Sequence, residues 1–209
     1  MYMIKNKLPS ISTLFLSLLF FCNGHAQEKL YPNTFDLNQV TLLEGPFKTA
    51  RDLNIEVLLQ YDMDRLLAPY RKEAGLEPKA PAYPNWEGLD GHVGGHYLSA
   101  MAMNYAATGN MECKQRMDYM VSQLKECQDA NAKNNPEWGK GYAGGFPNSA
   151  KLWPSFKNGD FKVYFSSWAP WYNLHKMYAG LRDAYIYGDN EMARDIFLKF
   201  CDWGIELTA

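Results

Sequence analysis

Apolar residues recur at helical spacing along most of the chain, and this pattern predicts a series of helices. The first is expected from Phe47 to about Tyr70, because apolar side chains return there every three to four residues. Its stripe consists of Ala50, Leu53, Asn54, Val57, Leu58 and Tyr61, of which only Asn54 is polar. Upstream, residues 27–46 alternate only briefly, which fits a strand or an extended segment.

Two helical hairpins are predicted after a proline-containing loop. In the first, residues 97–107 are apolar on almost every side, which indicates a helix buried on most sides. The turn "ATGN" follows, with Asn110 as the expected N-cap of the return helix. The return helix has one apolar face, made of Met117, Met120, Val121, Leu124 and Cys127. In the second hairpin the two stripes are Leu174, Met177, Tyr178, Leu181, Ala184 and Tyr185, then Ile196, Phe197, Phe200, Cys201 and Trp203.

The two hairpins repeat at an offset of 80 residues. Gly109-Asn110 corresponds to Asp189-Asn190, and Met117 and Met120 correspond to Phe197 and Phe200. Repeated units of inner helix, short turn and outer helix predict an all-α toroid, or alternatively a helical solenoid. Five helices cannot close a twelve-helix (α/α)6 barrel, so we expect residues 27–209 to be the N-terminal portion of a longer, incomplete toroid.

A long segment separates the two hairpins. Residues 130–173 contain four tryptophans, three tyrosines, four phenylalanines and five glycines. A connection of this length is usually functional or disordered, and its aromatic content argues against disorder. Aromatic residues make up 15% of the whole chain, and sugars are commonly held by stacking on aromatic rings. We therefore expect this long aromatic loop to take part in glycan binding.

The first 26 residues resemble a secretory signal. Lys5 and Lys7 precede an apolar run, residues 11–21, and cleavage is expected after Ala26. The run is too short for a permanent membrane span, so the chain is expected to be exported to the periplasm or beyond the cell. A lipid anchor on Cys22 is disfavoured because Phe20 and Phe21 stand where small residues are expected.

The charge of the chain excludes one class of partner. After cleavage, 19 lysines and arginines remain against 23 acidic residues, a formal charge of −4. A nucleic-acid-binding protein needs a basic stripe, and the sequence has none.

The cysteines do not suggest a disulfide or a metal site. Cys113 and Cys127 fall on one predicted helix, about 21 Å apart at 1.5 Å per residue, whereas a disulfide needs Cα atoms within about 7 Å. With Cys201 they form no zinc-binding spacing. The three are interpreted as buried free thiols, and no metal is expected in this part of the protein.

The motif "HVGGH" admits three readings. His92 and His96 have the i, i+4 spacing of zinc-binding histidines, but Val93 stands where a metalloprotease carries its glutamate. The histidines could instead be structural, with a ring bonded to the backbone. The third and favoured reading places them at the rim of a substrate pocket, because Gly94 and Gly95 would let the backbone approach a ligand.

His175 occupies the matching place at the start of the second inner helix. In a toroid such helix ends line the mouth of the central cavity, so both hairpins are expected to present a histidine there, although a capping role stays possible. Asp90 and Glu87 are weaker candidates, as acceptors for sugar hydroxyls or as acid/base groups.

Two long motifs carry a resemblance to a known family. "GLDGHVGGHYLSAMAMNYAATGN" and "WAPWYNLHKMYAGLRDAYIYGDN" resemble the N-terminal catalytic region of the β-L-arabinofuranosidases of glycoside hydrolase family 127 and its relative, family 146, formerly domain of unknown function 1680. The resemblance covers roughly residues 35–209. It implies an (α/α)6 barrel that removes terminal β-L-arabinofuranose from plant glycans with retention of configuration.

The resemblance also implies a zinc-bound cysteine nucleophile and a glutamate acid/base. The family's cysteines and glutamates lie in the second half of the barrel, beyond Ala209, so no catalytic or metal role is carried onto this chain and zinc is expected only in the full-length parent. The sugar pocket is expected to include His92, His96 and His175, and by neighbourhood alone Asp90, Trp86, Trp168, Trp171 and Tyr172.

Three functions therefore compete. The first is the N-terminal part of an exported arabinofuranosidase acting on an arabinose-containing glycan. The second is a non-catalytic glycan-binding α/α module. The third, a helical scaffold for protein partners, fits poorly with the aromatic loop, and the sequence does not indicate an oligomeric state.

Overall fold

The structure is a computed structural model that describes residues 34–84 and 88–209. The chain divides into two compact units, Met1–Phe35 and Asp36–Ala209, and the account below concerns the second. The predicted signal peptide, residues 1–26, lies outside the described residues, as do Trp86 and Glu87.

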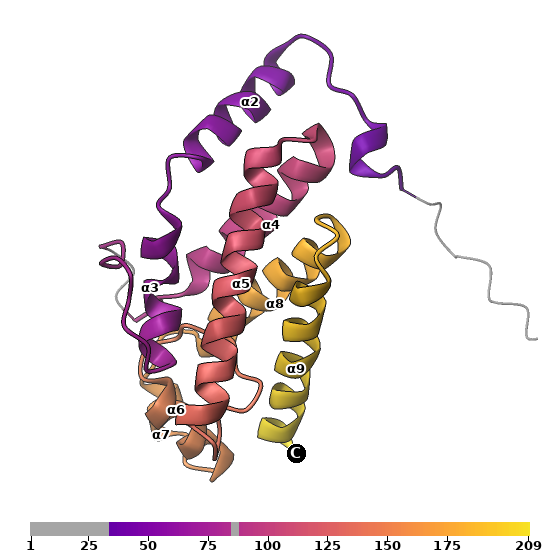
Figure 1. Ribbon diagram of the computed structural model, residues 1–209. Helices are drawn as coiled ribbons and strands as arrows, with labels where there is room; N and C mark the ends of the chain where they lie inside the picture. Colours follow the sequence, from indigo (N-terminus) through magenta and orange to yellow (C-terminus); the bar gives the residue numbers. More distant parts are fainter. Residues whose placement is uncertain (1–33, 85–87) are drawn as a thin grey trace, which may run out of the picture. The chain divides into compact units, whose positions relative to one another are not determined.

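The described residues form α-helices, one 3-10 turn and no β-strand (Figure 1). The all-α prediction is therefore confirmed. None of these helices is both long enough and apolar enough to cross a bilayer. The elements are η2 (Leu37–Gln39), α2 (Pro46–Leu58), α3 (Met63–Glu73), α4 (His92–Thr108), α5 (Met111–Asn134), α6 (Ser149–Lys157), α7 (Lys162–Phe165), α8 (Pro170–Ile186) and α9 (Glu191–Thr208).

The two hairpins are α4–α5 and α8–α9, and their return helices start 80 residues apart, as the sequence repeat predicts. Asn110 caps α5, because its Oδ1 accepts from the backbone N–H groups of Glu112 and Cys113. Asn190 caps α9 in the same way, accepting from Ala193 at 2.9 Å. Such caps satisfy amides that a helix start leaves without a partner, so each turn ends the inner helix and begins the outer one.

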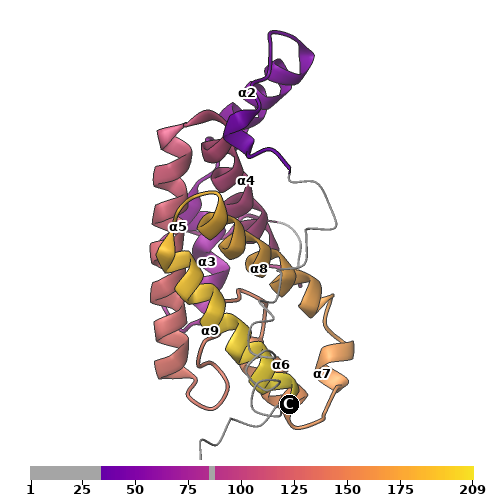
Figure 2. The same cartoon turned by 90° about the vertical axis from the view of Figure 1, so that its right-hand side faces the viewer.

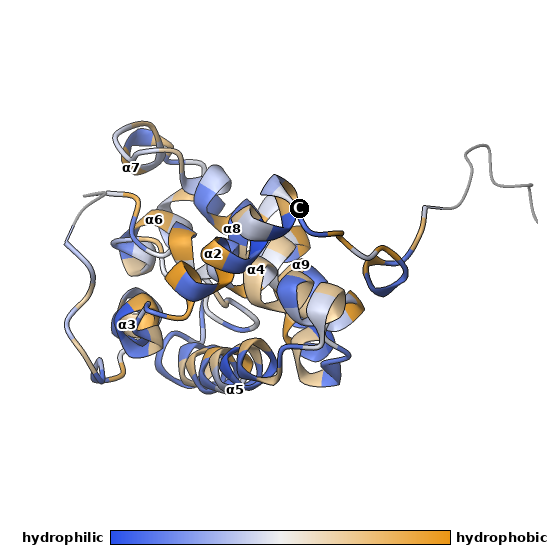
Figure 3. Ribbon diagram, turned by 90° about the horizontal axis from the view of Figure 1, so that it is seen from above, coloured by the Kyte–Doolittle hydropathy of each residue, from blue (hydrophilic) through white to orange (hydrophobic). Residues whose placement is uncertain are grey.

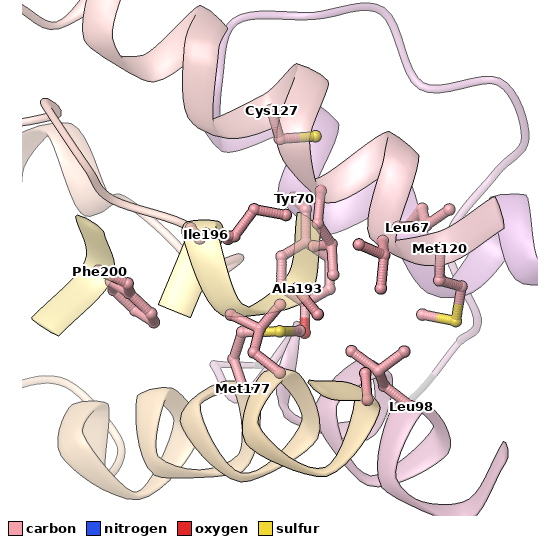
Figure 4. Packing of buried hydrophobic residues seen from close by; sticks show 14 of the residues in the cluster. Leu67, Tyr70, Leu98, Met120, Cys127, Met177, Ala193, Ile196 and Phe200 are labelled. Carbon is pink, nitrogen blue, oxygen red and sulfur yellow. The ribbon is translucent and has the colours of Figure 1, made fainter. Parts of the chain in front are cut away.

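The core lies between the inner helices α4 and α8 and the outer helices α5 and α9. Figure 4 shows Leu98 of α4 and Met177 of α8 facing Met120 and Cys127 of α5, with residues of α9 beside them. The predicted apolar face of α5 is buried throughout. Figure 3 shows α4 as largely hydrophobic and α5 as mixed, which fits an inner helix covered on several sides and an outer helix with one solvent-facing side.

The faces predicted for the second hairpin are only partly buried. Met177 and Leu181 are fully enclosed, but Tyr185 is exposed, and Phe197 and Cys201 are half-buried. The prediction that all three cysteines are buried therefore holds for Cys113 and Cys127 alone.

The prediction of a single helix from Phe47 to about Tyr70 is wrong. This segment forms two helices, because the chain breaks between Leu58 and Met63 and Asp62 caps the new start by accepting from the amides of Asp64 and Arg65. Its apolar stripe is mostly exposed: Leu53 and Val57 face solvent, and only Ile55 of α2 is buried. Periodicity identifies an apolar face but does not say whether another element covers it. Figure 2 shows α2 extending beyond the ends of α4 and α5.

The segment 130–173 is not one long loop. It contributes the end of α5, then α6 and α7, and the start of α8. Most of its aromatic residues are packing residues, since Trp138, Tyr142, Phe146 and Trp153 are buried. Tyr142 lies at the centre, with ring centroids of Trp138 and Trp203 at 5.3 and 4.8 Å. The expectation that this aromatic surplus serves glycan binding is thus wrong for these four side chains.

Buried side-chain amides let this irregular segment enter the core. Gln128 of α5 donates to the carbonyl oxygen of Gly141 in this segment, and Asn131 donates to that of Tyr142. Gln128 also donates to the carbonyl oxygen of Ile196 in α9. Buried backbone carbonyls need such partners where no helix supplies them. The segment is therefore fixed from α5, and it in turn positions the start of α8.

Candidate functional site

The site is built where the N-terminal ends of α4 and α8 meet. A Cβ on Gly95 would lie 2.2 Å from the carbonyl oxygen of Lys176, and one on Gly180 would lie 2.6 Å from the carbonyl oxygen of Gly95. Gly94 in turn faces the ring of Tyr70, where a Cβ would lie 2.8 Å from the nearest ring atom. These distances are below van der Waals contact, so glycine is required for the two backbones to touch.

This contact corrects one argument made from the sequence. We expected the two glycines of "HVGGH" to leave room for a ligand. Instead they lie inside α4 and make room for α3 and α8. They place His96 next to His175 and Lys176 because the backbone of Gly95 touches that of Lys176.

The loop before α4 is tied to its neighbours by hydrogen bonds. Asn173 of α8, which is buried, donates through Nδ2 to the carbonyl oxygens of Leu89 (3.1 Å) and Asp90 (2.7 Å). The hydroxyl of Tyr70 donates to the carbonyl of Gly91. Gly91 has φ +96° and its missing Cβ would lie 2.8 Å from the backbone of Gly145, a conformation and a space that suit only glycine. Three segments thus fix where α4 begins.

His92 supports this loop rather than facing solvent. Its ring is 7% exposed, and Nδ1 lies 2.8 Å from the carbonyl oxygen of Leu89. A carbonyl oxygen only accepts, so Nδ1 carries the proton. Among the readings of "HVGGH", the backbone bond favours a structural role for His92.

His96 and His175 share the exposed face beside it. Tyr172 of α8 is 47% exposed, and its ring lies 6.3 Å from that of His92, which in turn lies 6.1 Å from that of His96. The ammonium of Lys176 lies 4.3 Å from the centre of the Tyr172 ring. Burial lowers the pKa of His96 below its ordinary value, and the charges of Lys176, His92 and His175 lower it further. We call His96, Tyr172, His175 and Lys176 the histidine face.

The remaining candidates separate into two groups. Trp168 is 55% exposed and lies against Gly88, whose Cβ would be 3.8 Å from that of Trp168, so it belongs to the same loop region. Trp171 instead packs on Trp153, with ring centroids 5.5 Å apart, and contributes to the aromatic core.

Asp90 lies on the α3 side of the loop. Together with Lys72 and Glu73 it lines a cavity of about 220 Å³ between α3 and the proline-containing loop. Its charge acts on Glu73, whose pKa is raised chiefly by burial and further by Asp90. The structure thus does not bring the carboxyl of Asp90 to the histidine face.

The described residues do not fit a zinc site. No group of three histidine, cysteine, aspartate or glutamate side chains among them could hold a metal ion. Burial raises the pKa of the Cys127 thiol to about 12 and that of Cys113 above its ordinary value. A thiol needs a lowered pKa to act as a ligand or nucleophile near neutral pH, so no chemical step is assigned to these cysteines.

Sequence reasoning missed Asn173 and Lys176. Both stand beside His175 in "YNLHKMY", and both are polar residues within a helix whose buried face is apolar. A polar residue in such a position indicates a hydrogen bond to another element. The sequence does not say which element, because Asn173 and its partner Leu89 are 84 residues apart and meet only through the packing of α8 on α4.

The architecture is that of an α/α toroid, assembled from helical hairpins whose inner helices lie side by side. Residues 39–209 match the family described as beta-L-arabinofuranosidase, GH127 catalytic domain, and the chain belongs to this family. The predicted family and helical fold are thereby confirmed, and the domain type is that of a glycoside hydrolase. A comparison with curated proteins gives no match.

Proposed function

We propose that this chain is the N-terminal portion of the catalytic domain of an exported, retaining β-L-arabinofuranosidase acting on plant glycans. In this proposal the histidine face forms part of the wall of the sugar pocket. Family membership supports the reaction class. The position of His96 and His175 on adjoining inner helices is the observation that carries the role of this region.

The chemistry of the histidine face suits a sugar. Imidazole nitrogens donate to or accept from hydroxyl groups, and the exposed rings of Tyr172 and Trp168 offer apolar surfaces for C–H faces. The lowered pKa of His96 keeps its ring neutral near pH 7, so it can both donate and accept. His92, below them, holds the loop in place.

The reacting groups are proposed to lie outside this chain. A retaining glycosidase needs a nucleophile and an acid/base group on opposite sides of the bond that is cleaved. The buried thiols of Cys113 and Cys127 do not meet that need. We therefore expect the nucleophile, the acid/base group and any zinc ligands in the rest of the parent enzyme.

Alanine substitutions in the parent enzyme test the role of the histidine face. His96→Ala and His175→Ala should each lower kcat/KM for 4-nitrophenyl β-L-arabinofuranoside about 2- to 10-fold, because a hydrogen bond between neutral groups contributes about 0.5–1.5 kcal/mol. Gln115→Ala on the exposed side of α5 is the control and should leave kcat/KM unchanged. Normal activity in both histidine variants would refute the assignment.

The alternative is a non-catalytic glycan-binding module. The exposed aromatic and histidine side chains would serve that function equally well. The 209-residue chain alone, assayed on the same arabinoside with and without added zinc, should show binding without turnover under either proposal. Turnover by the chain alone would show that the reacting groups are present in it, and a parent enzyme without hydrolytic activity would favour the module.

Export is proposed from the N-terminal sequence alone. The mature protein recovered from the periplasm or the medium should begin near Gln27, as N-terminal sequencing can determine. A mature protein that begins at a lipid-modified Cys22 would instead support membrane anchoring.

A further inference from the structure

The histidine face contains an ammonium group, that of Lys176, which a neutral furanose does not require. The ammonium of Lys176 lies over the ring of Tyr172, 4.3 Å from its centre. His175 precedes it on α8, and the contact of Gly95 with the backbone of Lys176 places His96 alongside. Among residues 34–84 and 88–209, the charged groups that act on His96 are all bases: Lys176, His92 and His175.

Two acidic side chains of the described residues, Asp183 and Asp90, lie in other environments. Asp183, two turns along α8 from Lys176, is buried, accepts from the hydroxyl of Ser99 at 2.7 Å and is paired with Arg182 at 3.1 Å. Asp90 lies on the other side of the loop, in the cavity that it shares with Glu73. Within residues 34–84 and 88–209, Lys176 makes a cation–π contact with Tyr172 but no ion pair.

We propose that Lys176, His96 and His175 bind the carboxylate of an acidic sugar, a uronic acid residue of the glycan. This inference rests on the proposed function and adds a substrate class to it. An ammonium group and two imidazoles are donors of the kind that a carboxylate accepts in charge-assisted hydrogen bonds. Tyr172 offers its exposed ring to the pyranose.

Lys176 and the two histidines have different roles in this proposal. Lys176 supplies the charge, and its position over Tyr172 keeps that charge beside the ring on which the sugar stacks. His96 and His175 supply N–H donors that fix the orientation of the carboxylate. Lys176 is thus the residue that determines specificity for an acidic over a neutral sugar.

Binding of an anion has a measurable consequence for His96. A carboxylate beside an imidazole favours its protonated form, so binding should raise the pKa of His96. A neutral sugar at the same place should leave it unchanged or lower it through further burial. The direction of the shift therefore separates the two kinds of ligand.

A pair of methyl glycosides that differ in one group provides the test. Methyl α-D-galacturonide and methyl α-D-galactoside, the carboxylate and its hydroxymethyl counterpart, are titrated into the purified chain while the imidazole resonances of His96 and His175 are followed by NMR. The galacturonide should bind about 10-fold more tightly, as expected when a charge-assisted bond replaces a neutral one, and should raise the pKa of His96. Both effects should weaken as salt is increased.

Matched lysine variants locate the source of the preference. Lys176→Met keeps most of the aliphatic stem but removes the charge, and should abolish the preference for the galacturonide. Lys199→Met, at an exposed lysine of α9, should retain it. Circular dichroism of both variants checks that the helices are intact. Equal binding of the two glycosides, or an undiminished preference in Lys176→Met, would overturn the inference.

Two further measurements distinguish a uronic acid site from a general anion site and from the proposed glycosidase function. Sodium acetate and inorganic phosphate at the same concentrations should bind more weakly than the galacturonide, and tighter binding of either would exclude a uronic acid site. Hydrolysis of the neutral 4-nitrophenyl β-L-arabinofuranoside by the parent enzyme tests the proposed function separately. The glycosidase assignment can thus hold even if the galacturonide does not bind preferentially. Conversely, the galacturonide can bind preferentially even if the parent enzyme does not hydrolyse the arabinofuranoside.

Discussion

Gly95 of α4 and Gly180 of α8 lie in direct contact across the two inner helices, since a Cβ on Gly180 would stand 2.6 Å from the carbonyl oxygen of Gly95. The same approach brings Gly95 onto the backbone of Lys176. The position of the histidine face therefore depends on the absence of two side chains rather than on the presence of others.

Gly95→Ala should destabilise the protein strongly. The added methyl group would meet the backbone of Lys176, which cannot move as the end of a flexible side chain can. A loss of about 3 kcal/mol is expected from such overpacking, measured as the free energy of unfolding in urea. Gly204→Ala in α9 is the control: its Cβ would meet only the hydroxyl of Tyr178 at 3.0 Å, and alanine improves helix propensity by about 1 kcal/mol. Equal losses in the two variants would contradict the assigned contact.

Asn173→Ala should loosen the loop before α4. It removes both donors to the carbonyl oxygens of Leu89 and Asp90, and a buried carbonyl left without its donor costs about 1–3 kcal/mol. Asn173→Asp should be at least as damaging, because a carboxylate cannot donate to either carbonyl. The control is Asn104→Ala, whose amide donates only to the carbonyl of Ala100 within its own helix. Stability unchanged by Asn173→Asp would show that these bonds contribute little.

The three described thiols should differ in reactivity. Cys113 and Cys127 are buried, and burial raises both of their pKa values, that of Cys127 to about 12. Cys201 is less buried, although burial raises its pKa as well. Iodoacetamide at pH 8 should therefore modify Cys201 first, and the other two only in denaturant, as peptide mass mapping can show. Rapid modification of Cys127 in the folded protein would contradict its burial.

Glu73 should make stability depend on pH. Its carboxylate accepts from the amides of Asn148 and Ser149, but burial raises its pKa above the ordinary value of 4.5. The folded state then holds this proton more tightly than the unfolded state does, so this contribution to stability decreases as pH rises above 4.5.

The variant Glu73→Gln isolates this dependence. It removes the titrating group, so the decline in unfolding free energy above pH 4.5 should be shallower than in the unaltered protein. Glu137→Gln, at an exposed loop position, should leave the slope unchanged. An unchanged slope in Glu73→Gln would place the effect on another group.

Local sequence information identified the hairpins because caps and periodicity act over a few residues. Asn110 and Asn190 cap their helices through amides two or three residues away, and the apolar face of α5 follows from side chains on consecutive turns. The same information does not show that the apolar stripe of α2 is mostly exposed, because burial depends on which element lies opposite.

The sequence by itself thus determined an all-α chain of repeated hairpins and three histidines near inner-helix ends. Only the tertiary structure decided which of them are exposed. In that structure His92 is buried and bonded to the carbonyl oxygen of Leu89. Gly94 and Gly95 lie at the contacts of α4 with α3 and α8, and Lys176 lies close enough to His96 to affect its pKa. The physical reason is distance along the chain: periodicity and caps are local, whereas these contacts depend on how closely α8 approaches α4.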